Sequence, residues 1–172
     1  KVKLADSNGK TLAGYKYVTP DDPNVVYGVV KGKTYRVGTY ASGMASPNMY
    51  EIAVANTAIS EKSGSSKSKA VTLSKGTKKY GSIAAGSSTN DYYKFKLSSK
   101  KAIQIQMKGA TNDTLKIAIY DKKGLIGTKS FTSTTGTLTL KSVGKWTSGT
   151  YYVRIYRGNA SSSGWYSLLL SY

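Results

Sequence analysis

The chain has 172 residues, a formal net charge of +18, no cysteine and no histidine. It therefore lacks thiol and imidazole nucleophiles, disulfides and the common zinc and iron ligand sets. Its many glycines and tyrosines, with only three prolines, favour short strands and polar turns, so little or no helix is expected. No stretch approaches the ~20 apolar residues that a membrane-spanning helix needs.

Residues 2–5 (VKLA) predict a strand that runs into a tight turn over residues 6–9 (DSNG). The same pattern returns 115 residues later, where IAIY at 117–120 precedes DKKG at 121–124. In both places Asp opens the turn and can cap its backbone amides, and Gly closes it. Calcium is an alternative role for Asp6 and Asp121, although one carboxylate per turn offers few of the oxygens that calcium requires.

The next segment, residues 19–24 (TPDDPN), is a predicted exposed loop, followed by a strand over residues 25–30. Adjacent Asp21 and Asp22 are interpreted as turn formers, with cation binding or acid and base chemistry as the alternative.

A longer repeat joins two stretches of alternating apolar residues, 32–55 and 149–172. At a shift of 116 residues, Tyr35, Val37 and Thr39 correspond to Tyr151, Val153 and Ile155, and Tyr50, Ile52 and Val54 correspond to Tyr166, Leu168 and Leu170. Each stretch predicts a β-hairpin with these residues on its inner face. We therefore interpret residues 1–57 as the C-terminal half of a first β-sandwich repeat, whose apolar face (Val25, Val30, Tyr35, Val37, Tyr50, Ile52) must be covered by another segment or molecule.

Residues 58–69 are rich in Ser, Gly and Lys and predict a linker between the repeats. Charge changes at the same point. Residues 1–57 hold seven basic and four acidic side chains (+3), whereas residues 58–172 hold nineteen and four (+15). Only two of those nineteen are arginines, which suits a solvated lysine-rich surface better than bidentate phosphate recognition.

From residue 70 to residue 172, short alternating segments follow one another with no helical pattern between them. They predict seven to nine strands and an all-β, antiparallel, jelly-roll-like β-sandwich with little or no helix. The residues expected to point inward are Tyr93, Phe95, Leu97, Ile103, Ile105, Met107, Leu115, Ile117, Ile119, Leu138, Leu140, Tyr151, Val153, Ile155, Tyr166, Leu168 and Leu170.

Three blocks in this region, DYYKFKL at 91–97, LKIAIYDKKG at 115–124 and GTYYVRI at 149–155 with YSL at 166–168, resemble the bacterial pre-peptidase C-terminal (PPC) domain in order and spacing. The resemblance covers about residues 58–172, with 70–172 as the complete copy. It implies a non-catalytic domain appended to secreted or cell-surface bacterial proteins, from a Gram-positive bacterium in our reading. Some relatives bind collagen, glycans or calcium; those that bind calcium carry an acidic cluster near the domain start, where this chain has Glu61 among lysines.

We accordingly expect an accessory or adhesion module that binds an extracellular polysaccharide or matrix protein, or a spacer beside a neighbouring repeat of the same parent chain. The candidate ligand-binding residues are outward-facing aromatic and polar side chains, because rings stack on sugars and amides direct hydrogen bonds: Gln104, Gln106, Tyr120, Tyr152, Arg154, Tyr156 and Trp165. These residues could instead stabilise the sheet through cross-strand pairs.

Two other functions are weighed against this one. The lysine excess could bind an anionic polymer such as teichoic acid, a sulfated glycan or nucleic acid, and such binding would weaken with salt. Catalysis is not expected, because the eight carboxylates are scattered and no motif selects a Ser-Lys pair. The sequence therefore assigns no catalytic residue, no metal ligand and no cofactor.

Overall fold

A computed structural model describes residues 1–41, 51–132 and 136–172. These residues form strands and loops but no helix, so none of their segments is a helix that could cross a membrane. The strands are β1 (Val2–Asp6), β2 (Thr11–Lys16), β3 (Tyr35–Thr39), β4 (Val71–Thr72), β5 (Lys79–Ile83), β6 (Asp91–Leu97), β7 (Gln104–Thr111), β8 (Thr114–Tyr120), β9 (Leu125–Thr132), β10 (Thr137–Lys141), β11 (Gly149–Arg157) and β12 (Gly164–Ser171).

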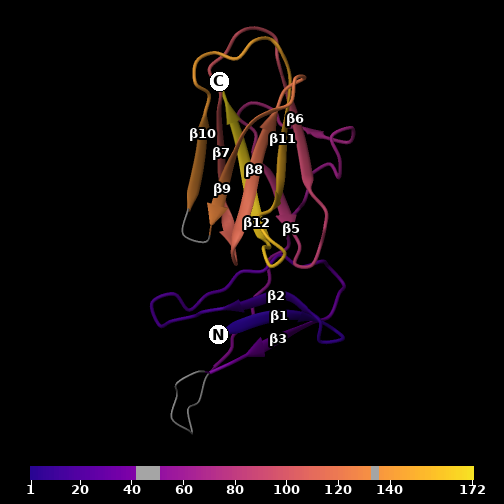
Figure 1. The fold of residues 1–172 in the computed structure, drawn as a ribbon, viewed down its shortest axis with the longest axis vertical. Helices are drawn as coiled ribbons and strands as arrows, with labels where there is room; N and C mark the ends of the chain where they lie inside the picture. Colours follow the sequence, from indigo (N-terminus) through magenta and orange to yellow (C-terminus); the bar gives the residue numbers. More distant parts are fainter. Residues whose placement is uncertain (42–50, 133–135) are drawn as a thin grey trace.

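Strands β4 to β12 build a sandwich of two sheets, which forms the long upper body of the molecule in Figure 1. One sheet has five strands in the order β4-β6-β11-β8-β9, and the other has four in the order β10-β7-β12-β5. All pairings are antiparallel except that of the two-residue β4 with β6. The predicted all-β antiparallel sandwich is confirmed.

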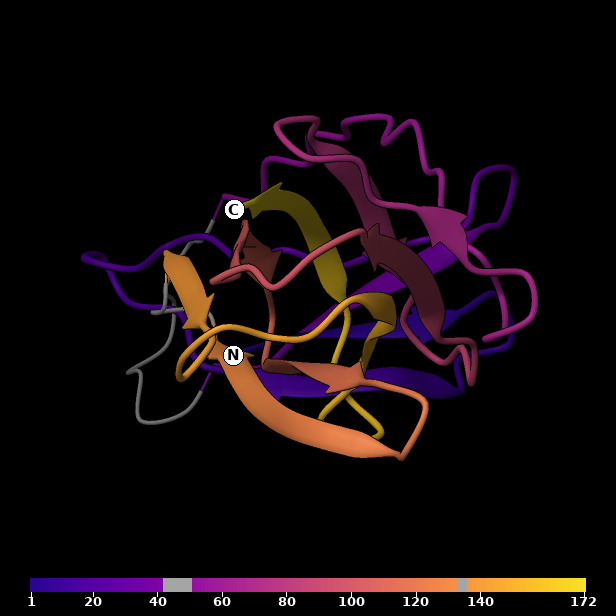
Figure 2. The same ribbon diagram turned by 90° about the horizontal axis from the view of Figure 1, so that it is seen from above.

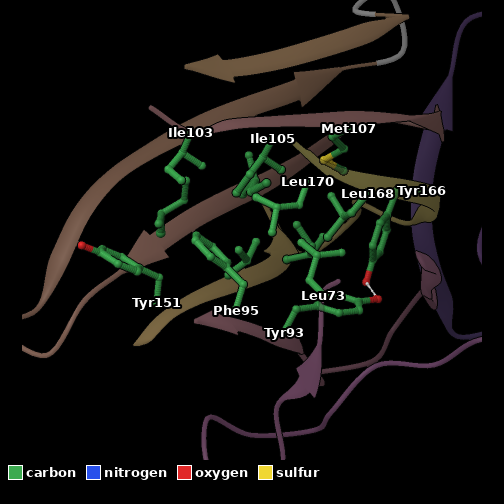
Figure 3. Close-up of a cluster of buried hydrophobic side chains, with 14 of the residues drawn as sticks. Leu73, Tyr93, Phe95, Ile103, Ile105, Met107, Tyr151, Tyr166, Leu168 and Leu170 are labelled. Carbon is green, nitrogen blue, oxygen red and sulfur yellow. Dashed lines mark hydrogen bonds between the residues drawn. The ribbon is translucent and has the colours of Figure 1, made fainter. Parts of the chain in front are cut away.

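The sandwich core is made largely by the alternating residues that the sequence placed inside, nine of which are labelled in Figure 3 together with Leu73; the core also includes Ile83 and Phe131. Among the predicted inward residues, Leu138 and Leu140 are only partly buried and pack against the core, and the others are at most 5% exposed. Three aromatic rings stack in this core. The centroids of Phe95 in β6 and Tyr151 in β11 are 5.4 Å apart, and those of Trp146 and Tyr151 are 4.9 Å apart. Burial of such apolar side chains stabilises each by roughly 1.5–3 kcal/mol.

The closing segment is not a hairpin, which corrects the sequence interpretation. Strand β11 hydrogen-bonds to β6 and β8, whereas β12 hydrogen-bonds to β5 and β7 in the opposite sheet. Their apolar faces meet across the core, about 10 Å apart in a β-sandwich, and are not paired by backbone bonds. The connection is fixed at Asn112, whose side-chain oxygen accepts from the Ser163 amide at 2.7 Å and whose amide donates to the Ser161 carbonyl at 2.8 Å. Alternation specifies only which face of each strand is buried. It is equally compatible with a hairpin within one sheet and with a connection that crosses from one sheet to the other.

The two Asp-initiated turns are confirmed. Asp6 Oδ1 accepts from the Asn8 and Lys10 amides at 2.9 and 3.0 Å. Asp121 Oδ1 accepts from the amides of Lys123 and Gly124 at 2.7 and 3.0 Å. Each carboxylate therefore caps its own turn, as a short acidic side chain does at such positions.

Strands β1 to β3 form a separate sheet in the order β2-β1-β3, and this order matches β9-β8-β11 in the sandwich. The register matches too. Leu4 lies opposite Val37, and the residues 115 and 116 positions later, Ile119 and Val153, also lie opposite each other. Two register shifts interrupt the β1–β2 pairing, one between Val2 and Leu4 and one between Leu4 and Ala5. The second corresponds to the shift in β8–β9, which falls between Ile119 and Tyr120. The shared strand order and the matching register of β1–β3 and β8–β11 extend the sequence repeat to three hydrogen-bonded strands.

Other expectations for the first repeat are wrong. Residues 25–30 form no strand, and neither do residues 51–57, where Ile52 and Val54 are 48% and 77% exposed. Val37 is 43% exposed, whereas its counterpart Val153 is fully buried. Tyr50 lies outside the described residues. In the sandwich, β12 pairs with β7 and β5. The described N-terminal sheet contains only β2, β1 and β3, so residues 51–57, which correspond to β12, have no such partner strands.

The N-terminal sheet lies across one end of the sandwich, below it in Figure 1 and beneath it in the view from above in Figure 2. A small cluster of Leu4, Ala13 and Ala85 joins the two parts, with Leu12, Tyr27 and Tyr35 packed around it. Residues 25–30 lie along this junction as a loop, because the Gly28 carbonyl accepts from the Ala85 amide at 2.8 Å. Packing against the sandwich thus covers part of the first repeat's apolar face.

Residues 58–69, predicted as a linker, are tied to the sandwich. The Gly64 amide and carbonyl exchange hydrogen bonds with Tyr92 of β6 at 3.1 and 2.7 Å. Ser63 and Glu61 add side-chain hydrogen bonds to Asp91 and Ser82.

We expect Gly28→Ala to loosen the junction, because a Cβ at this position would lie 2.2 Å from the Ile83 carbonyl oxygen. Forcing that contact should destabilise docking of the N-terminal sheet by about 1–3 kcal/mol. Hydrogen exchange at the Ala85 amide and the β1 amides would measure it. Gly127→Ala is the matched control, since a Cβ there meets nothing within 4 Å. Equal protection in both variants would contradict this view of the junction.

Candidate functional site

The structure divides the seven candidate residues between the two outer faces of the sandwich. Tyr120 of β8 and Tyr152, Arg154 and Tyr156 of β11 belong to the five-stranded sheet, whereas Gln104 and Gln106 of β7 and Trp165 of β12 belong to the four-stranded sheet. All seven are partly exposed. Because the core lies between the sheets, the two groups cannot form one contact surface.

The first group lies on β11, the central strand of its sheet, and on the neighbouring β8. Tyr152 is opposite Lys94 on one side and Tyr120 on the other. Arg154 is opposite Tyr92 and Ala118, and Tyr156 is opposite Lys116. Since side chains two residues apart share a face, these residues form one patch, and none of the opposed residues is acidic. We call it the β11 surface: Tyr92, Lys94, Lys116, Tyr120, Tyr152, Arg154 and Tyr156.

Cations lie over the rings of this surface. The Nζ of Lys67 is 4.7 Å from the Tyr152 ring centroid and 6.0 Å from that of Tyr120. The Arg154 guanidinium carbon is 4.3 Å from the Tyr156 centroid. Such contacts are attractive by about 0.5–2 kcal/mol, so they hold the rings and charges in place.

Arg154 uses only part of its donor capacity. Its Nη2 donates to Asn90 Oδ1 at 3.0 Å, but its Nε is buried with no hydrogen-bond partner among the described residues. The Asn90 hydrogen bond and the Tyr156 ring together hold the guanidinium at the centre of the β11 surface.

The second group is less compact. Gln106 lies opposite Thr139 and Leu169, and Trp165 lies opposite Ser82 and Ala110. Along β7 the Trp165 position is four residues beyond Gln106, which corresponds to about 13 Å. The glutamines and Trp165 are therefore not brought together.

Asp91 forms a buried polar cluster at the start of β6. It is 4% exposed, its Oδ2 accepts from the Tyr166 hydroxyl, and its Oδ1 accepts from Ser63 Oγ at 2.9 Å. Burial raises the pKa of Asp91 to about 7; the Tyr166 hydrogen bond opposes this, and the negative charge of Glu61 adds to it. The Tyr93 hydroxyl lies 3.0 Å from that of Tyr166, and burial raises the pKa of both tyrosines.

This cluster borders a cavity of about 400 Å³ that Glu61 and Asp91 share with Ser, Gly, Thr, Asn and Lys residues. Ser63 Oγ is also 2.7 Å from Glu61 Oε1. A hydroxyl has one proton to donate, so Ser63 can hydrogen-bond both carboxyls at once only if one of them is protonated. The described residues contain no group of three or more acidic, His or Cys side chains placed to hold a metal ion.

Sequence reasoning missed Tyr92, Lys94 and Lys116 as members of the β11 surface, and Lys67 as its cation. Their outward positions follow from strand alternation, but which strands adjoin β11 depends on the sheet order. Predicting these members would have required the pairing register of β6 and β8 with β11.

Comparison with solved structures places the sandwich among known folds. The pre-peptidase C-terminal domain of a collagenase from Bacillus anthracis is similar at a TM-score of 0.50 and 18% identity, over 59% of this chain and 94% of that domain. A carbohydrate-binding module, CBM36, solved with calcium and xylotriose, has a TM-score of 0.35 and 13% identity, over 54% of this chain and 87% of that module. No protein-family model and no curated protein matches the sequence. The first likeness shows that the chain contains a β-sandwich with a PPC-like fold.

Proposed function

We propose that this chain is a non-catalytic accessory module of a secreted or surface-attached bacterial protein, and that it binds an extracellular polysaccharide through the β11 surface. The observation that carries the proposal is the row Tyr152, Arg154 and Tyr156 on the central strand, flanked by Tyr92 and Tyr120. Flat, partly exposed rings suit sugar faces, and a neighbouring guanidinium suits sugar hydroxyls or carboxylates.

The fold supports the same proposal in a second way. The β11 surface rests on a sheet whose inner face is fully packed, so its rings are held on rigid strands and do not lie on mobile loops. A preorganised surface loses little conformational entropy when it binds. The PPC-like fold is compatible with an accessory role.

The alternative function is lysine-driven binding to an anionic polymer. Lys67, Lys94, Lys116 and Arg154 all lie at the β11 surface, so both hypotheses use the same residues. They differ in salt dependence: attraction between exposed charges is largely screened beyond about 8–10 Å at physiological ionic strength, whereas stacking on a neutral sugar is not.

A glycan and matrix-protein array, probed with the full chain at low and moderate salt, tests the proposal. We expect binding to polysaccharides that Tyr152→Ala weakens about tenfold, because a central aromatic contact usually contributes more than 1 kcal/mol. Tyr80→Ala is the matched control, since Tyr80 is 43% exposed on the other sheet. Equal binding by the two variants, or no glycan bound by the wild-type chain, would refute the proposed function.

We also propose that residues 1–57 are the C-terminal half of a preceding copy of the sandwich, with residues 58–69 as the boundary and residues 70–172 as the complete copy. The shared strand order of β2-β1-β3 and β9-β8-β11, the matching register of β1–β3 and β8–β11, and one bulge at the same position support this. In such an arrangement the outer face of β1 to β3 corresponds to the β11 surface.

A further inference from the structure

The N-terminal sheet carries its own exposed aromatic and cationic patch. Tyr15, Tyr17 and Tyr40 are 47%, 68% and 53% exposed. The rings of Tyr15 and Tyr40 are 6.0 Å apart and tilted at 56°. Two ammonium groups lie among the rings: Lys1 Nζ is 4.5 Å from the Tyr17 centroid and 5.5 Å from that of Tyr40, and Lys3 Nζ is 5.2 Å from that of Tyr15. We call this patch the β1 surface.

The β1 surface is the counterpart of the β11 surface. Tyr40 and Lys1 correspond to Tyr156 and Lys116 at the shifts of 116 and 115 residues that align the two sheets. In the sandwich Tyr156 lies opposite Lys116, and in the N-terminal sheet the Tyr40 backbone amide donates to the Lys1 carbonyl at 2.9 Å. The same tyrosine and lysine therefore adjoin on corresponding outer faces. The other two tyrosines, Tyr15 and Tyr17, come from β2 and the residues just after it.

A cavity of about 430 Å³ lies at the junction between the N-terminal sheet and the sandwich. One side is lined by Tyr15 and Lys16, and Tyr15 is itself part of the β1 surface. The other side includes Thr114 and Thr132, which lie opposite each other at the ends of β8 and β9. Thr114 shares the outer face of β8 with Lys116 and Tyr120, and six residues of strand span about 20 Å. The outer face of β8 thus runs from Tyr120 past the small, buried Ala118 and the partly exposed Lys116 to Thr114 at the cavity, whose other side includes Tyr15.

The polar lining of the cavity favours a hydroxylated ligand there. Asp113 is the lining carboxylate, and its oxygens already accept from Thr114 Oγ1 at 3.0 Å and Asn159 Nδ2 at 2.7 Å. Cations lie on both sides, at Lys1 and Lys3 on one and at Lys116 and Arg154 on the other. A ligand with sugar rings and anionic groups would match rings and ammonium groups on both surfaces.

We propose that the β1 surface is a second polysaccharide-binding site and that one anionic polysaccharide chain crosses the junction cavity to contact both surfaces. The inference rests on the proposed function and adds the ligand class, the second site and the path between them. Two surfaces on one polymer raise the effective concentration of each, so a long chain should bind more tightly than a fragment that reaches only one.

Dextran sulfate and neutral dextran are the probes, because they share a backbone and differ in charge. We expect the full chain to bind long dextran sulfate more tightly than dextran, and Tyr17→Ala and Tyr152→Ala each to weaken that binding about five- to tenfold. Tyr17 is chosen because it is 68% exposed and its removal leaves no cavity in the core; circular dichroism checks the fold. Tyr80→Ala is the control.

The outcomes separate the two proposals. Loss of binding in Tyr152→Ala but not in Tyr17→Ala would overturn the second site and keep the proposed function. No effect of Tyr152→Ala would overturn the proposed function itself. A sulfated oligosaccharide too short to reach both surfaces should be bound with little or no gain from the second surface; equal affinity of the short and long ligands would overturn the crossing path. If oligo(dT) bound as tightly as dextran sulfate at the same salt, the assignment to a sugar polymer would be wrong.

Discussion

Replacing Asp91 by Asn should make the protein about 2–4 kcal/mol more stable at pH 8 and leave it unchanged near pH 4. The pKa of Asp91 is about 7 in the folded chain against an ordinary value of 3.8. Between these values the folded state binds more protons than the unfolded state, so the free energy of unfolding falls as pH rises from about 4 to about 7. One pH unit corresponds to about 1.4 kcal/mol, which sets an upper bound of ~4 kcal/mol.

The asparagine side chain imitates the protonated carboxyl at this position. Its oxygen can accept from Ser63, and its amide can donate to the Tyr166 hydroxyl, which now donates to Asp91. The hydrogen bonds of the buried network are then kept while the desolvated charge is removed.

Urea unfolding of both proteins from pH 4 to pH 8 provides the measurement, read as the difference between variant and wild type so that other titrating groups cancel. Glu61→Gln is the matched variant: without the Glu61 charge the pKa of Asp91 should fall, and the pH dependence should shift to lower pH. A difference that stays constant across the range would show that Asp91 titrates with its ordinary pKa.

Leu168→Ala should cost about 2–5 kcal/mol, whereas Ile52→Ala, at the corresponding position of the first repeat, should change stability by less than about 0.5 kcal/mol. Leu168 is fully buried between the sheets, and Ile52 is 48% exposed in a segment without strand pairing. Equivalent positions of the two repeats therefore contribute very differently to the free energy of unfolding.

Chemical denaturation of the two variants measures this contrast directly. A large cost for Ile52→Ala would mean that residues 51–57 are packed in solution, either by another copy or by other strands. It would contradict the exposed conformation of this segment. It would also show that the segment's apolar side chains are buried by another part of the protein or by a second copy.

The two leading functional hypotheses, a glycan-binding face and a lysine-rich anion-binding face, coincide on the β11 surface. Tyrosines and cations alternate across three strands there, because Tyr152 is opposite Lys94 and Tyr156 is opposite Lys116. An anionic polysaccharide would use both kinds of side chain, which is why the ligand tests compare charged and neutral forms of one polymer.

Alternation by itself determined most of the core residues, although it did not identify Leu73, Ile83 and Phe131. Tyr93, Phe95 and Leu97 could be placed inside from sequence because strand side chains point to opposite faces with period 2, and burial of one face fixes the pattern. The Asp-initiated turns were equally predictable, since their hydrogen bonds are local: Asp121 caps amides two and three residues away. The 115- and 116-residue shifts also came from the sequence, and the register of β1–β3 and β8–β11 agrees with them.

Only the tertiary structure decided which strands are neighbours. It put β11 and β12 in opposite sheets, separated Trp165 from Tyr152, brought Lys94 and Lys116 beside the tyrosines, and left residues 51–57 unpaired. The physical reason is that period-2 alternation specifies a buried face for each strand but no partner. Partners are set by long-range backbone pairing and by the hydrogen bonds of the connections, as at Asn112, and both depend on residues far apart in the chain.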